Sequence, residues 1–170
     1  NMKINIGGET KKEGWMNYNV QKKPNVDIVG NINDLSQFEN ESVEEIYASH
    51  VIEHVDQKTI KNTFKDIFRI LKKEGKFYVS VPDMDVLCHF FVSPLANKKI
   101  KFHTMRMIFG GQVDNFDYHY FGWNYEFMND YLLEAGFFEI RKVDSFGLFE
   151  DTSNYKPYGF PISLNVVAIK

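Results

Sequence analysis

The sequence has 170 residues, 44% of them hydrophobic, with a net charge of −3 and one cysteine. This length suits one domain, residues 1–170, that can bury a sizeable core. The charge gives no reason to expect nucleic-acid binding, and no apolar run approaches the roughly 20 residues that cross a bilayer. The lone Cys88 excludes an internal disulfide framework and fits a reducing compartment. We therefore expect a cytoplasmic protein with no membrane or nucleic-acid partner, and a homodimer stays open.

Short β-type runs separated by turn residues dominate the first third of the chain. The first run ends at Gly7-Gly8, and a polar stretch with Pro24 separates the second run from the third, as turn residues commonly bound strands. Their shortness is typical of strands that are buried in a parallel sheet. The predicted strands cover residues 3–6, 16–20, 26–29 and 44–49.

The clearest predicted helix covers about residues 56–73, because its apolar residues recur at three- and four-residue spacing. Gly75 follows as a predicted left-handed stop, and residues 76–81 then predict another strand. The apolar stripe of the helix consists of Ile60, Phe64, Ile67, Phe68 and Leu71.

The second half of the chain alternates between helical and strand patterns. Residues 83–123 predict short helices and loops, and Asn124 predicts the N-cap of a helix that stops at Gly136. Two late strands are expected at 137–143 and 162–169. This alternation predicts an α/β protein with a mostly parallel sheet, whose ligand site lies at the carboxyl ends of the strands.

Three segments carry motifs whose order and spacing are specific when taken together: NIGGETKKEGWMNYNV at 5–20, EEIYASHVIEHV at 44–55 and FRILKKEGKFYVSVPDMDVL at 68–87. The pattern resembles a branch of the Rossmann-like S-adenosylmethionine-dependent methyltransferases whose members are frequently associated with cell-envelope glycan biosynthesis. The resemblance implies a seven-stranded Rossmann-like methyltransferase sheet, mostly parallel with an antiparallel last strand, helices on both faces, and S-adenosylmethionine as cofactor. Further matching segments are GGQ at 110–112, DYHYFGW at 117–123, EAGF at 134–137 and SLNVVAIK at 163–170.

The resemblance also implies which strand ends bind the cofactor. Gly7 and Gly8 form the turn that lets the backbone approach it, although two adjacent glycines suit any turn that follows a strand. Ser49 and His50, at the end of a later strand, border the same site. Glu9 stands where the family usually has another glycine.

Two further cofactor positions depart from the family pattern. Asn19 replaces an acidic residue that accepts hydrogen bonds from the ribose hydroxyls. Asn31 replaces an Asp that holds the adenine amino group, and Asp34 lies nearby as an alternative for that role. An amide has one acceptor oxygen where a carboxylate has two. These changes predict weak cofactor binding that improves on Asn19→Asp, and they leave open a non-catalytic methyltransferase-like domain with a binding or assembly role.

His50, Glu53 and His54 spell H-x-x-E-H, the sequence of an inverted zinc-peptidase motif. That motif needs both histidines on one helical turn. Here a predicted strand runs directly into His50, so the two histidines should diverge, and we expect no metal. His54 is then a candidate catalytic residue beside the acceptor, or His54 and Glu53 only cap the following helix or fix the loop.

Two other regions offer catalytic candidates. Asp83 follows a strand and can meet the substrate or cap the next helix. His119, among Asp117, Tyr120 and Trp123, can act as a general base in a cluster that recognises a sugar or another planar acceptor, or it can belong to a packed loop. The sequence thus favours a methyltransferase acting on a small-molecule or glycan acceptor, with His119, His54 and Asp83 as catalytic candidates.

Overall fold

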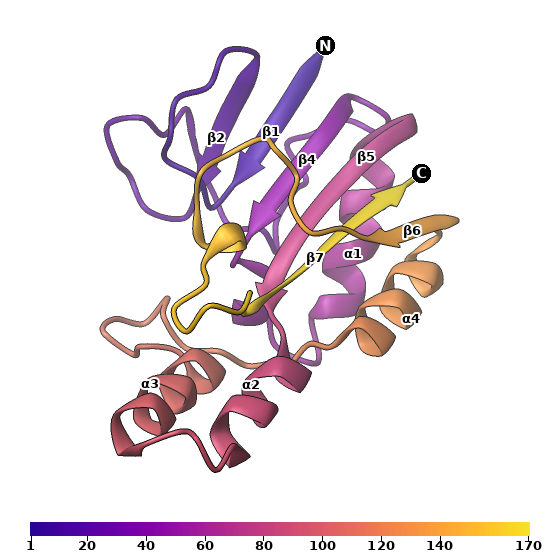
Figure 1. Ribbon diagram of the computed structural model, residues 1–170. Helices are drawn as coiled ribbons and strands as arrows, with labels where there is room; N and C mark the ends of the chain where they lie inside the picture. The colour runs from indigo at the N-terminus through magenta and orange to yellow at the C-terminus, as the bar shows by residue number, and fades with distance from the viewer.

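A computed structural model describes residues 1–170 and contains one seven-stranded sheet (Figure 1). The strand order is β3-β2-β1-β4-β5-β7-β6, and every neighbouring pair is parallel except for those made by β7. This confirms the predicted sheet with its antiparallel last strand. The strands are β1 (Met2–Ile6), β2 (Trp15–Asn19), β3 (Ile28–Val29), β4 (Val43–Ser49), β5 (Leu71–Pro82), β6 (Glu139–Lys142) and β7 (Ser163–Ile169).

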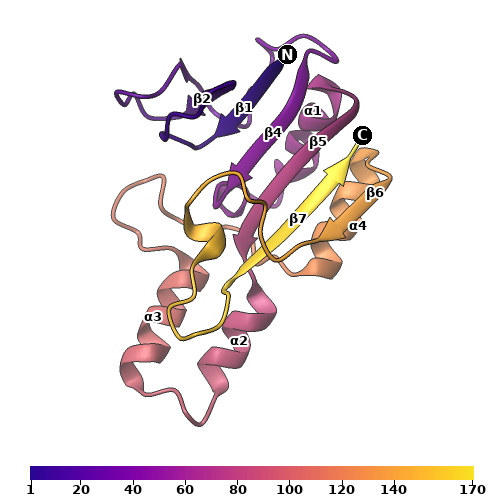
Figure 2. The same ribbon diagram turned by 45° about the horizontal axis from the view of Figure 1, so that its top comes forward.

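Helical segments lie on both faces of the sheet and beyond its carboxyl edge (Figures 1 and 2). Helices α1 and α4 pack together on one face, whereas the segment between β6 and β7, with its short 3-10 helix η2, crosses the other. Helices α2 and α3 form a hairpin past the end of β5. The bounds are η1 (Ile52–His54), α1 (Ile60–Ile70), α2 (Met84–Val92), α3 (Lys98–Phe109), α4 (Tyr125–Ala135) and η2 (Thr152–Asn154).

The face of the sheet beneath α1 and α4 is apolar. Ile46 of β4 and Phe77 of β5 are fully buried there in one cluster with Phe64 and Ile67 of α1. The rings of Phe64 and Phe77 meet edge to face with centroids 6.0 Å apart. Burying each large side chain of this kind contributes roughly 1.5–3 kcal/mol. The stripe predicted from the sequence therefore builds the main core.

The opposite face of the sheet is aromatic and polar. The Tyr47 hydroxyl donates to Oδ2 of Asp151 at 2.7 Å, and the Tyr47 ring lies 4.7 Å from that of Phe149. Nδ2 of Asn165 donates to the carbonyl of Ser153 at 3.0 Å. These contacts dock the β6–β7 segment onto the sheet through hydrogen bonds as well as through apolar packing.

The boundary between α1 and β5 differs from the prediction. The helix ends at Ile70, and β5 begins directly at Leu71, so the residues expected in the last helical turn belong to the strand. The predicted left-handed stop at Gly75 is wrong: Glu74 has the positive φ of 62°. Gly75 serves a close approach instead, since a Cβ there would lie 2.7 Å from the carbonyl oxygen of Lys72.

The boundaries of α4 agree with the prediction. Oδ1 of Asn124 accepts a hydrogen bond from the amide of Phe127 at 2.9 Å, which makes Asn124 the N-cap. Gly136 ends the helix in the left-handed region with φ 117°.

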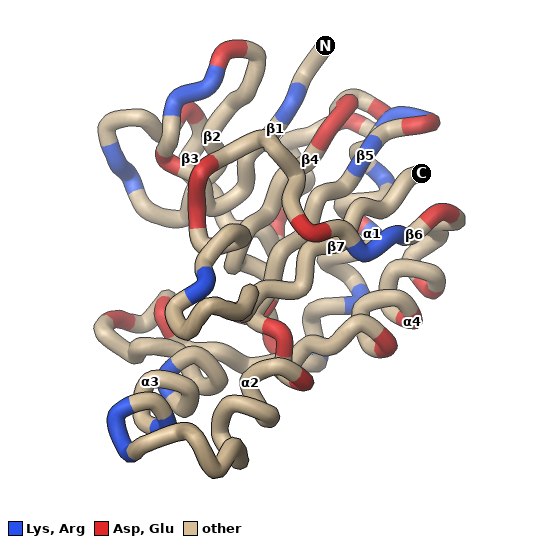
Figure 3. Tube along the Cα trace, viewed as in Figure 1, with Lys and Arg blue, Asp and Glu red and all other residues tan.

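Charges are interspersed over the surface in the view of Figure 3, in keeping with the small net charge. None of the helices combines the length and the apolar character that a membrane crossing requires.

Candidate active site

A cavity of about 460 Å³ opens at the carboxyl ends of β1 and β2, in the size range of small-molecule sites. Its strand wall comprises the lining residues of 6–33, at the ends of β1 to β3. Its loop wall comprises residues 113–118 and Tyr120, from the connection between α3 and α4. His50, Val51, His54 and Val55 line the cavity between these two walls.

Gly7 sits at the base of the strand wall in a conformation that requires glycine. Its φ is 76°, and a Cβ would overlap Cγ2 of Val51. Its amide donates to the carbonyl of Tyr18 at 2.7 Å. The backbone at Gly7 is therefore exposed to the cavity at a point that no side chain can occupy. Gly8 does not line the cavity, and a Cβ there would overlap the side chain of Asn5.

Asn19 lines the strand wall, and its amide is engaged with the backbone. Nδ2 donates to the carbonyls of Gly7 at 3.1 Å and Gly8 at 3.3 Å, while Oδ1 accepts from the amide of Gln21 at 2.9 Å. The side chain therefore holds the glycine turn against the end of β2.

Asn31 also lines the cavity and is fixed by local contacts. Its Oδ1 accepts from the amide of Asn33 at 2.9 Å, and its carbonyl accepts from the Tyr18 hydroxyl at 2.9 Å. Glu9 lies outside the lining residues and pairs with Lys23 at 2.6 Å, which offsets its negative charge.

The H-x-x-E-H segment bends at the end of β4. Ser49 is the last residue of the strand and does not line the cavity, and His50 has a left-handed φ of 55°. Nε2 of His50 lies 2.7 Å from Oγ of Ser163. Glu53 and His54 follow on η1, so the two histidines of the segment leave the backbone at different elements, as the sequence predicts.

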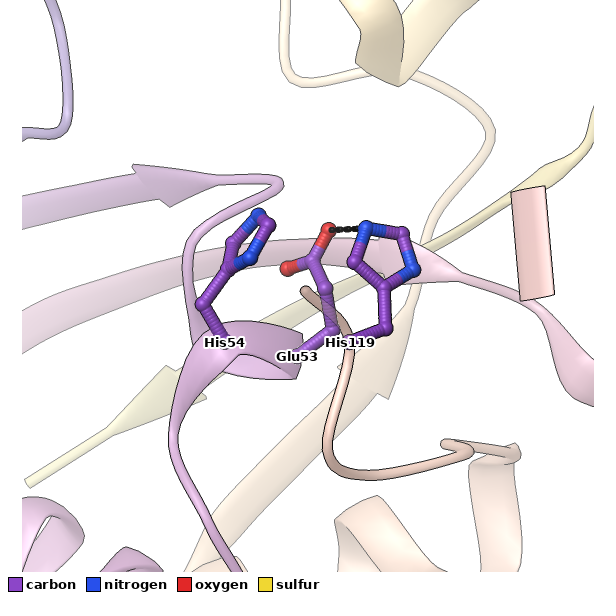
Figure 4. Close-up of side chains that lie close together, drawn as sticks. All are labelled: Glu53, His54 and His119. Carbon is purple, nitrogen blue, oxygen red and sulfur yellow. Dashed lines mark ion pairs between the residues drawn. The ribbon is translucent and has the colours of Figure 1, made fainter. Parts of the chain in front are cut away.

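His119 completes a cluster with Glu53 and His54 (Figure 4). The two imidazole centroids are 4.8 Å apart, and Nε2 of His119 lies 4.0 Å from Oε2 of Glu53. Burial lowers the pKa of His119, which favours its neutral form. Burial works to raise the pKa of Glu53, but His50 and the other two nearby imidazoles outweigh it and hold this pKa below its ordinary value.

Of the remaining candidate residues, some line the cavity and others have a structural role elsewhere in the fold. Asp83 is buried, does not line the cavity, and accepts from the amide of Asp85 at 3.1 Å as the N-cap of α2. Trp123 is fully buried in the core, stacked on Phe121 at 3.8 Å. Asp117 lines the loop wall, as does the half-exposed Tyr120.

Glu53 is the residue that sequence reasoning undervalued. The motif around it was visible, but its partner His119 comes from a loop far along the chain, and no local pattern joins the two. The amide of Tyr120 donates to the carbonyl of Glu53 at 2.8 Å, so the backbone itself fastens this loop to η1.

The family model of the methyltransferase domain matches residues 4–79. The search of curated proteins finds no match. Three solved structures align with 99% of this chain. An S-adenosylmethionine-dependent methyltransferase from Archaeoglobus fulgidus has 16% identity, a TM-score of 0.63 and 86% of its own chain covered. A second one, from Thermotoga maritima, has 15% identity, a TM-score of 0.56 and 81% of its own chain covered. The methyltransferase in complex with the Haloferax volcanii Trm112 activator has 14% identity, a TM-score of 0.56 and 81% of its own chain covered.

The sheet order, with its antiparallel last strand, and the cavity at the strand ends are those of the Rossmann-like methyltransferase fold. At these identities the structural likeness shows the fold, and the match to the methyltransferase-domain model is confined to residues 4–79. Residues 4–79 thus resemble a methyltransferase domain, and the chain has the fold of the Rossmann-like S-adenosylmethionine-dependent methyltransferases, which implies S-adenosylmethionine as the cofactor.

Proposed function

We propose that the protein transfers a methyl group to a small-molecule or glycan acceptor, with the cofactor on the strand wall and the acceptor against the loop wall. The observation that carries this proposal is the shared cavity, whose strand wall offers the bare backbone of Gly7 and whose loop wall offers aromatic and acidic side chains. Aromatic faces beside hydrogen-bonding groups suit a sugar or another flat polar molecule.

The residues of the strand wall fit S-adenosylmethionine. Gly7 leaves room for close approach, Val20 and Ile32 supply apolar surface, and Asn31 lies at the end of β3. Bound there, S-adenosylmethionine supplies an activated methyl group on a sulfonium. The protein's own task is then to hold the acceptor in line and to accept its proton where needed.

We assign two groups to the acceptor side: His54, which lines the cavity, and His119, which is not a lining residue but contacts the His54 ring. Nδ1 of His54 lies 2.9 Å from the carbonyl of Tyr118, and Nδ1 of His119 lies 3.0 Å from that of Met107. A carbonyl only accepts, so each neutral ring keeps its proton on Nδ1 and has a basic Nε2. Asp83 serves instead as the cap of α2, and we assign it no chemical role.

The alternative is a methyltransferase-like domain that binds or assembles without catalysis. One observation favours it: both polar atoms of the Asn19 side chain are already engaged with Gly7, Gly8 and Gln21. In that case this side chain has little hydrogen-bonding capacity left for a ribose.

Label transfer from S-adenosylmethionine carrying a tritiated methyl group tests the proposal against panels of monosaccharides, sugar nucleotides and oligosaccharides. We expect transfer to at least one class, falling roughly 10²- to 10⁴-fold in His119→Ala, as for loss of a general base. His89→Ala is the matched control, since His89 is exposed on α2. Tight cofactor binding with no transfer to any acceptor would favour the non-catalytic alternative.

A further inference from the structure

The Glu53 carboxylate is buried without hydrogen-bond partners. Its side chain is 1% exposed, and neither Oε1 nor Oε2 accepts a hydrogen bond. An ionised carboxylate left unpartnered in the interior carries a large desolvation cost, so such a group points to a missing cation or proton donor. The surroundings of Glu53 indicate which of these it is.

In their neutral forms the imidazoles beside Glu53 present lone pairs to it rather than protons, so each of them attracts its carboxylate only when it is protonated or when a cation lies between them. His119 donates its Nδ1–H toward the carbonyls of Met107 at 3.0 Å and Ile108 at 3.2 Å, which leaves a lone pair on Nε2. That nitrogen lies 4.0 Å from Oε2 of Glu53, beyond hydrogen-bonding distance. His54 follows the same rule, because its Nδ1 faces the carbonyl of Tyr118 at 2.9 Å.

His50 adds a third nitrogen of the same kind. The Ser163 hydroxyl donates to the carbonyl of Thr152 at 2.9 Å, so it accepts from Nε2–H of His50 at 2.7 Å. Nδ1 of a neutral His50 then has a lone pair 3.4 Å from Oε2 of Glu53. Lone pairs on the two histidines, His50 and His119, therefore face the same carboxylate oxygen.

We propose that Glu53, His54 and His119 bind one divalent transition-metal ion. One ligand atom from each of the three lies within 4.8 Å of the others, and Figure 4 shows the carboxylate between the two rings. Ligands at about 2.0–2.1 Å from a tetrahedral zinc stand about 3.4 Å apart, so small side-chain movements close the site. Backbone carbonyls that hold Nδ1–H are the outer contacts that orient metal-binding histidines.

The ligand set selects the kind of metal. Two imidazole nitrogens and one carboxylate suit zinc or ferrous iron, whereas magnesium prefers oxygen ligands and retained water. Three protein ligands leave at least one coordination position open. His54 lines the cavity, so that position lies at the acceptor side.

The open position gives the metal a role in choosing the acceptor. With Nε2 of His54 and His119 bound to it, the ion would replace these two bases in activating the acceptor: a hydroxyl oxygen bound at the open position is polarised, which favours acceptors with a free hydroxyl, such as sugars. This consequence rests on the proposed methyl transfer, whereas metal binding itself does not.

The inference is tested by measuring metal binding to the tag-free protein, from which metal has first been removed with a chelator followed by dialysis. Calorimetry with Zn²⁺ and the visible absorption of bound Co²⁺ report the site, and Mg²⁺ serves as the negative control. We expect about one Zn²⁺ per chain, bound at least roughly 10-fold more weakly in His54→Ala, in His119→Ala and in the shape-conserving Glu53→Gln. His89→Ala retains wild-type binding, and thermal melting shows which variants remain folded.

Absence of stoichiometric Zn²⁺ and Co²⁺ binding by the wild type overturns the inference, as does undiminished binding by folded His54→Ala and His119→Ala. Titration of S-adenosylmethionine into the metal-free protein keeps the two proposals apart. Cofactor binding and undiminished methyl transfer by the metal-free protein refute only the role of the metal in choosing the acceptor, and they leave the proposed function standing. Stoichiometric metal with no methyl transfer to any acceptor supports the site and refutes the proposed function.

Discussion

The two walls of the cavity are built in opposite ways. On the strand wall, Asn19 and Asn31 are fixed by hydrogen bonds to neighbouring backbone, and the sheet positions both. On the loop wall, the side chains of Phe116, Tyr118 and Tyr120 are 52%, 40% and 52% exposed. In the function proposed above, backbone geometry would therefore form the cofactor half, whereas side chains on a connecting loop would form the acceptor half. Loops on a rigid scaffold commonly carry specificity in this way.

Gly7→Ala should have the largest effect on cofactor binding and stability, because it changes the backbone conformation of the strand wall. A left-handed φ costs an alanine roughly 1–2 kcal/mol, and overlap with Val51 adds roughly 1–3 kcal/mol. We expect loss of S-adenosylmethionine binding and a clear fall in melting temperature. Gly14→Ala is the matched control, since its φ is 80° but no atom lies within 4 Å of its added Cβ. Equal melting temperatures for the two variants would contradict the overlap with Val51.

Tyr120→Ala should separate the two walls. It removes an exposed ring from the loop wall but keeps the backbone amide that donates to Glu53. Loss of a stacking contact of about 1.4 kcal/mol raises the acceptor KM about 10-fold. We expect the affinity for S-adenosylmethionine to stay within about 2-fold, and Tyr120→Phe to behave as wild type. A cofactor affinity that falls as far as the acceptor affinity would show that the walls do not divide the site.

Asn19→Asp tests a point on which sequence and structure disagree. The sequence predicts tighter cofactor binding, because a carboxylate suits ribose hydroxyls. The structure predicts the opposite, because the substitution removes the two hydrogen bonds that Nδ2 donates and places a carboxylate against the carbonyls of Gly7 and Gly8. At roughly 0.5–1.5 kcal/mol for each of the two lost bonds, we expect cofactor affinity to fall about 5- to 160-fold by calorimetry. Improved affinity would show that Asn19 turns to the ribose when the cofactor binds.

Asp83→Asn should have the smallest effect, since Asp83 lies outside both walls. Asn caps helices as well as Asp, and burial raises the pKa of Asp83. Because the pKa of Asp83 is higher in the folded than in the unfolded protein, its ionised form lowers the free energy of unfolding at pH values above the folded pKa. This destabilisation fades as the pH falls through the folded pKa and is gone below the unfolded pKa of about 3.9. The variant should thus match or slightly exceed the wild type near neutral pH, and the gap in melting temperature should close in acid. A transfer rate reduced 100-fold would instead restore Asp83 as a catalytic residue.

The parts of the fold that followed from the sequence are those set by local patterns. The stripe of Phe64 and Ile67 predicted α1, and Asn124 and Gly136 predicted the limits of α4. The predicted end of α1 at about residue 73 lies too far along the chain. The residues from Leu71 onward belong to β5, because their pairing with β4 outweighs their helical spacing.

The candidate site was predicted only where it follows the strand ends. Gly7, Asn19, Asn31 and His50 line the cavity as expected for strand termini. The pairing of His119 with Glu53 could not be foreseen, because a long connection folds back on η1 and no sequence period records that contact. The Asn19 hydrogen bonds were equally hidden, since they depend on how β1 and β2 align.

Calorimetric titration of S-adenosylmethionine into the wild type, Gly7→Ala and Tyr120→Ala tests the central claim most directly, namely that the strand wall alone holds the cofactor. We predict one binding event per chain in the wild type and in Tyr120→Ala, and none in Gly7→Ala. Absence of binding in the wild type, or binding that depends on Tyr120 and tolerates Gly7→Ala, would contradict the account.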